Sequence, residues 1–71
     1  MNDVVIRESN SGTYLHSILL GRAHLRPLFW TSLPERALFF ETEEEAQACI
    51  DFISNVIDFE IAECLEIVFV P

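Results

Sequence analysis

The sequence predicts a small α+β domain: an antiparallel sheet of about four strands, in the order β-β-β-α-β, with one helix packed on one face. Two observations lead to this fold class. Segments rich in Val, Ile and Phe stand near both ends of the chain, and an amphipathic segment with helical spacing lies between them. The 71 residues are expected to form a single domain, residues 1–71, because a chain of this length supports only one core.

The first two predicted strands form a hairpin. Residues 3–8 are followed by Asn10 and Gly12, which can take the positive φ of a tight turn. Residues 13–20 return as a second strand that is apolar on both sides and therefore central in the sheet. Strict alternation places Leu15 and Leu19 on the face without a helix, where a dimer or target contact is expected.

The third strand is less sharply defined. Residues 23–30 contain Pro27, which restricts a strand there to an edge or a break, and Arg22, His24 and Arg26 would form one positive edge. The sequence leaves open what this edge meets. Residues 31–35 are expected to turn, and residues 36–41, with Leu-Phe-Phe at their centre, to form a further strand.

The helix is predicted over residues 43–57. Thr42 is a good N-cap, and Glu45 three residues later completes a capping box. The expected inward stripe consists of Ala46, Cys49, Ile50, Ile53 and Ile57, widened by Phe52 and Val56, and the expected outer face of Glu44, Gln47, Asp51, Ser54 and Asp58. Residues 63–70 then form the last strand.

The charge is divided unevenly along the chain. All four basic residues precede residue 37, whereas nine of the twelve acids follow it. A domain this small cannot bury nine carboxylates, so most of them must form a negative surface, which suits a partner with a positive one. The same charge argues against direct binding of nucleic acid or of an anionic membrane. No stretch is apolar enough to span a membrane and the start is not that of a signal peptide, so a cytoplasmic location is expected.

The sequence offers no catalytic constellation, and we expect neither an enzyme nor a cofactor or metal. The two glycines open no phosphate loop, and Cys49 and Cys64 show no informative spacing to a histidine. Both cysteines are expected to be apolar thiols, with a disulfide as the alternative. The acids of residues 41–45 are interpreted as a solvated first helical turn rather than a cation site.

Seven residues are candidates for partner binding. On an ideal helix Glu44, Asp51 and Asp58 lie roughly 10 Å apart, and such an array can imitate the phosphates of a duplex. Trp30 is a candidate aromatic anchor, with core burial as its alternative. The full set is Glu44, Asp51, Asp58, Glu60, Glu63, Glu66 and Trp30. Two functions remain open: a non-enzymatic inhibitor that binds the basic surface of a nucleic-acid-binding complex, or a self-associating structural or regulatory module, a homodimer, whose acids only confer solubility.

The segment from Trp30 to Ile53 resembles very small proteins of bacteriophages and other mobile elements. The resemblance rests on Trp30, Ala37, Phe40, Thr42, Glu44, Glu45 and Ala46 in that order: a Trp-containing turn, a strand ending in Phe, and a Thr-capped helix that opens with Glu-Glu-Ala. It covers about a third of the chain. Small acidic proteins of that origin include anti-CRISPR inhibitors, so the resemblance implies an inhibitor in the host cell cytoplasm and assigns no individual site residue.

Overall fold

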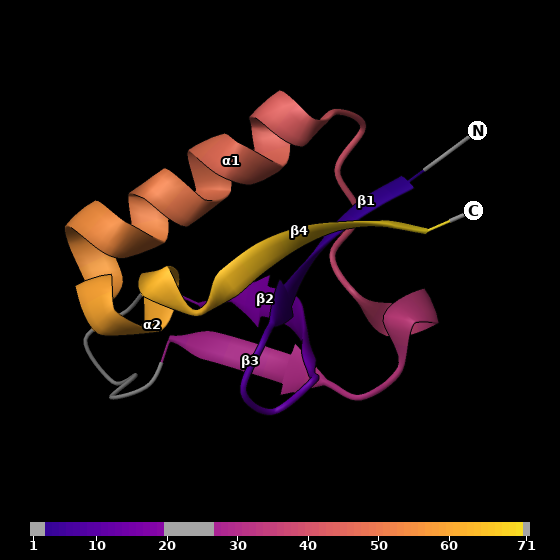
Figure 1. Cartoon of the computed structure of the whole chain (residues 1–71), viewed down its shortest axis with the longest axis horizontal. Coiled ribbons are helices and arrows are strands. Elements are labelled where there is room, and N and C mark those ends of the chain that lie inside the picture. The colour runs from indigo at the N-terminus through magenta and orange to yellow at the C-terminus, as the bar shows by residue number, and fades with distance from the viewer. Residues whose placement is uncertain (1–2, 20–26, 71) are drawn as a thin grey trace.

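The computed structural model describes residues 3–19 and 27–70 and confirms the α+β class (Figure 1). The predicted positive edge of Arg22, His24 and Arg26 lies outside the described residues. The strands are β1 (Asp3–Glu8), β2 (Tyr14–Ile18), β3 (Leu28–Thr31) and β4 (Leu65–Val70); the helical segments are the 3₁₀ turn η1 (Pro34–Arg36), α1 (Glu43–Phe52), the π-helical turn η2 (Ile53–Ile57) and α2 (Phe59–Glu63).

The antiparallel sheet has the strand order β3-β2-β1-β4. Strands β1 and β4 pair over their whole length, from Asp3 opposite Val70 to Glu8 opposite Leu65. Side chains alternate between the two faces, so Val4 and Ile6 face α1 and pack in the core cluster. Val5 points to the opposite face and is nevertheless fully buried.

A bulge at His16 changes the faces predicted for β2. Leu15 pairs with Trp30, whereas Ser17 already pairs with Phe29, so His16 is an extra residue in the ladder. Because of this extra residue, Ile18 lies on the same face of the sheet as Leu15. Both side chains pack in the core together with their partners on β3. The expectation that Leu15 lies on an uncovered face is therefore wrong: Leu15 is fully buried, while Leu19 is 46% exposed.

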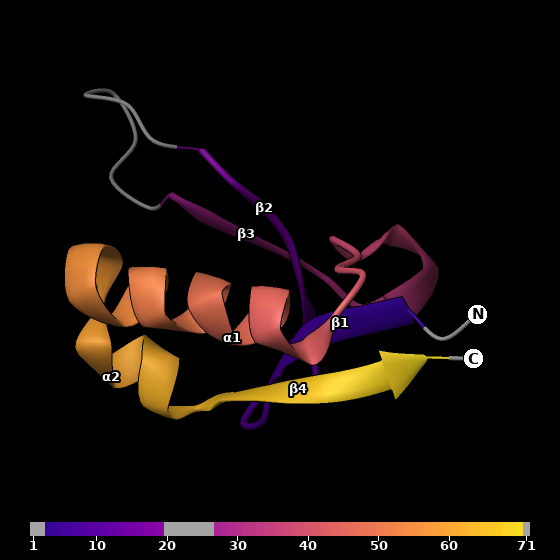
Figure 2. The ribbon, with the colours of Figure 1, turned by 90° about the horizontal axis from the view of Figure 1, so that it is seen from above.

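No strand forms at residues 36–41, where one was predicted. A 3₁₀ turn and a single β-bridge take its place. Residues Pro34–Arg36 form η1, and the chain then makes a single bridge between Phe40 and Val4. Just before it, the Leu38 N–H donates to the Leu15 carbonyl over 2.8 Å. The segment thus fills the space where β2 diverges from β1, a divergence that Figure 2 shows from above. The third strand of the sheet is β3.

The predicted helix begins as expected at Glu43. The Glu45 N–H donates to Oγ1 of Thr42 over 3.1 Å, and the Glu45 carboxylate accepts from the N–H of Glu41. Ala46, Ile50 and Ile53 are buried against the sheet. Two residues assigned to the inward stripe are not buried: Phe52 is 38% exposed and Val56 62%.

The helical path ends at Asp58, which does not lie on the outer face of one continuous helix. After the π-helical turn η2, which is rich in β-branched residues, Asp58 takes an extended conformation with φ −158°. Its side chain caps a second short helix, α2, which the sequence pattern does not predict. After this break, Asp58 and Glu60 line one hollow together with Trp30 of β3.

Candidate functional site

The chain passes from α1 to α2 at one end of the molecule (Figure 1). Residues of β3 and α2 line a groove there. It consists of two adjoining hollows that share Trp30, Asp58 and Ile61, and we call it the Trp30 groove. The larger hollow has a volume of about 650 Å³ and is lined also by Pro27, Leu28, Phe29 and Ile57. The smaller one, about 460 Å³, extends to Glu60, Cys64 and the turn that follows β1.

Trp30 forms part of the apolar floor of this groove. Its position on β3 opposite Leu15 places the indole on the helix side of the sheet, where it packs against the core cluster. The residue remains half-buried, so part of the indole also borders the groove. Core burial, the alternative considered for Trp30 from the sequence, therefore accounts for part of the side chain, and the part that borders the groove remains a candidate anchor.

Carboxylates form the rim of the groove. Asp58 Oδ1 accepts hydrogen bonds from the backbone N–H groups of Glu60, at 2.9 Å, and Ile61, at 3.3 Å. Asp58 is half-buried, and the next acid, Glu60, is exposed. Within residues 3–19 and 27–70 neither carboxylate forms an ion pair, and no basic residue lines the groove.

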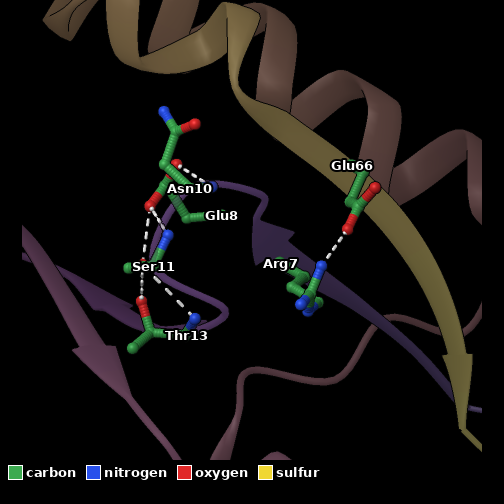
Figure 3. Close-up of polar contacts among 6 residues, drawn as sticks. All are labelled: Arg7, Glu8, Asn10, Ser11, Thr13 and Glu66. Carbon is green, nitrogen blue, oxygen red and sulfur yellow. Dashed lines mark hydrogen bonds and ion pairs between the residues drawn. The ribbon is translucent and has the colours of Figure 1, made fainter.

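The turn after β1 supplies the far wall of the smaller hollow, and its hydrogen bonds fix a third carboxylate (Figure 3). Glu8 accepts from the Ser11 hydroxyl over 2.6 Å and from the backbone N–H groups of Asn10 and Ser11 over 2.8 Å each. These donors, the Ser11 hydroxyl first, lower the pKa of Glu8. The Asn10 amide also reaches Sγ of Cys64 at 3.2 Å, which joins the turn to the end of α2. From the sequence this Ser-Asn-Ser-Gly segment is predicted only as a turn, although its hydroxyl and amide groups are the signal of such a network.

The remaining predicted acids lie elsewhere. Glu44 and Asp51 are exposed on α1, and Asp51 accepts from the Gln47 amide over 3.1 Å. Glu63 is exposed at the end of α2. Glu66 lies on the sheet face away from α1, where it forms an ion pair with Arg7 (Figure 3). That hydrogen-bonded pairing raises the pKa of Arg7.

The structure thus brings together Trp30, Asp58 and Glu60, three of the seven predicted partner-binding residues. Glu66 lies on the opposite face of the sheet from these three residues. No family model, curated protein or solved structure matches this chain.

Other chemistry is sparse in the part of the chain that the structure describes. Cys49 and Cys64 are free and half-buried, and burial raises the pKa of the Cys49 thiol. No three His, Cys, Asp or Glu side chains there are grouped as metal ligands. Across residues 3–19 and 27–70, none of the helices has the length and apolar character needed to cross a bilayer.

Proposed function

We propose that this chain is a non-enzymatic binding protein that inhibits a host nucleic-acid-binding complex, in the manner of an anti-CRISPR protein, through its acidic surface. One observation carries the proposal. Of the nine acids after residue 40, eight are exposed and the ninth, Asp58, is half-buried. Among the described residues only Glu66 forms an ion pair, so none of the other eight has a cationic partner there.

The mechanism is competition with phosphate. A nucleic-acid-binding channel presents Lys and Arg side chains to a regularly charged backbone, and a protein that presents carboxylates at similar spacing can occupy it. Glu44 and Asp51 lie along exposed positions of α1, while Glu60 and Glu63 continue the negative surface on α2. Because the attraction acts between exposed charges, it weakens as salt rises.

A charge-reversal pair tests this mechanism. Glu44→Lys together with Asp51→Lys changes the α1 surface by four units of charge while sparing Asp58, whose carboxylate caps α2. The tagged wild-type protein is expected to retain its partner from host lysate at low salt and to lose it progressively at high salt. The α1 variant is expected to lose the partner even at physiological salt, with circular dichroism confirming that the helices are intact.

The matched control is Asp3→Lys with Glu35→Lys, which alters net charge equally at exposed positions outside the helices α1 and α2. This control should keep most of the partner. Retention by the α1 variant at physiological salt would refute the electrostatic mechanism, as would equal losses in the two variants.

A second candidate is self-association, which one observation favours. Strand β4 is an edge of the sheet, all of its residues except Glu66 are apolar, and its Phe69 is 55% exposed. Edge strands of this kind pair readily with another copy. Light scattering of the purified chain distinguishes the candidates: a dimer that Phe69→Glu converts to a monomer supports a self-associating module, whereas a wild-type monomer contradicts it.

A further inference from the structure

We infer that the Trp30 groove binds an arginine side chain presented by the basic surface of the partner. The inference rests on the proposed function and specifies which residue type the acidic surface recognises. Its basis is the combination of an aromatic, apolar floor with a carboxylate rim in one hollow, which the acidic side of α1 does not offer.

The floor of the groove suits a planar cation. Trp30, Leu28 and Ile61 provide aromatic and aliphatic surface on which the alkyl part of a long side chain can lie. A guanidinium stacks on an indole and is more weakly hydrated than an ammonium, so it loses less on entering such a surface. A lysine side chain gains less from the same contacts.

The rim suits the same cation and no anion. Asp58 uses Oδ1 to cap α2, and no described residue donates to its Oδ2 or to the carboxylate of Glu60. Two carboxylates beside an indole can accept the forked N–H groups of one guanidinium. Glu8 contributes negative charge, but its oxygens already accept from Asn10 and Ser11, so it is expected to act at longer range.

Charge complementarity also excludes the other occupants that an apolar hollow could take. The lining residues include three acids, and the described part of the chain places no Arg, Lys or His among them. An uncharged apolar segment would leave these carboxylates partly desolvated without a partner, which is unfavourable. A phosphate or nucleic acid would be repelled.

The groove carries its own reporter, because Trp30 is the single tryptophan of the chain. We would titrate the wild-type protein with an acetylated peptide that carries three arginines separated by glycines, and follow the emission of Trp30 at physiological salt. Parallel titrations use the same peptide with lysine, and with citrulline as a neutral isostere of arginine. The arginine peptide is expected to change the emission saturably, with an affinity about fivefold or more above that of the lysine peptide and no response to citrulline.

Two double variants locate the binding. Asp58→Asn with Glu60→Gln removes both rim charges, while asparagine still caps α2. It should weaken arginine-peptide binding about fivefold or more, whereas Glu44→Gln with Asp51→Asn, an equal change of charge on α1, should weaken it less than about twofold. Thermal unfolding of both variants checks that they are folded.

Equal binding of the arginine and lysine peptides, or equal losses in the two double variants, would overturn the inference. So would the absence of any saturable change up to about millimolar peptide. None of these results decides the proposed function, which depends on α1 and on capture of the partner from lysate. Conversely, the groove could select arginine while the variant with Glu44→Lys and Asp51→Lys still captures the partner from lysate at physiological salt. That result would uphold this inference and refute the electrostatic mechanism.

Discussion

Replacing Leu15 by alanine tests the bulge that organises the core. Leu15 is fully buried, so truncation removes three carbon atoms from the core, worth about 2.4 kcal/mol at about 0.8 kcal/mol for each, and leaves a cavity besides. The expected loss is about 2–5 kcal/mol in the free energy of unfolding. A 71-residue domain is expected to have roughly 4–10 kcal/mol in total, so this single change removes a large part of its stability.

Leu19→Ala is the matched control, because simple alternation places Leu15 and Leu19 on one face whereas the structure leaves Leu19 46% exposed. Its expected cost is below about 1 kcal/mol. Urea unfolding followed by Trp30 emission measures both, and at about 1 kcal/mol per molar urea the Leu15 variant should unfold about 2 M or more earlier than wild type. If Leu15→Ala is largely unfolded in water, Leu15→Val should still cost about 1 kcal/mol. Equal effects at positions 15 and 19 would refute the bulge.

Two further predictions concern the turn after β1. Ser11→Ala removes the main donor to Glu8, so the pKa of Glu8 should rise toward its ordinary value of 4.5, as an NMR pH titration would show. Since the lowered pKa contributes stability above pH 4.5 that is lost as the pH falls through the native pKa, this variant should lose less stability on acidification than wild type; an unchanged Glu8 pKa would contradict the network. Gly12→Ala should cost about 1–2 kcal/mol in urea unfolding, because Gly12 has φ 74° and a Cβ there would lie 3.3 Å from the Arg7 guanidinium. Gly12→Asn, which tolerates this conformation better, should cost less, and equal stability of the alanine variant and wild type would contradict the assigned turn.

The elements with local signals were predicted well. The start of α1 follows from Thr42 and Glu45, whose hydrogen bonds depend only on residues a turn apart. The first hairpin turn follows from Gly12, which does take a positive φ. Strands β1 and β4 follow from β-branched composition, which requires no knowledge of their partners.

The wrong predictions concern segments whose local sequence fits two conformations. Packing against distant parts of the chain decides between them. Residues 36–41 have the composition of a strand, but η1 and the divergence of β2 from β1 leave only the bridge of Phe40 to Val4. His16 fits an alternating pattern as well as a bulge, and only pairing with β3 shows that it is an extra residue. Phe52 matches the helical stripe by spacing, yet it is 38% exposed, whereas Ile53 beside it is fully buried.

The Trp30 groove depends on two of these long-range decisions together. Trp30 lies on the helix side because β3 pairs with β2 in the register that sets it opposite Leu15, and Asp58 borders the groove where the helical path breaks and restarts as α2. Neither event has a strong local signal. The exception is Asp58, which by its spacing could be an acid of the outer helix face and by its residue type is a good N-cap. Periodicity assigned Asp58 the first of these roles, whereas its hydrogen bonds show the second. The negative charge of the chain was therefore visible in the sequence, but the place where that charge meets an aromatic surface depends on the fold, and it is there that we expect discrimination among basic side chains.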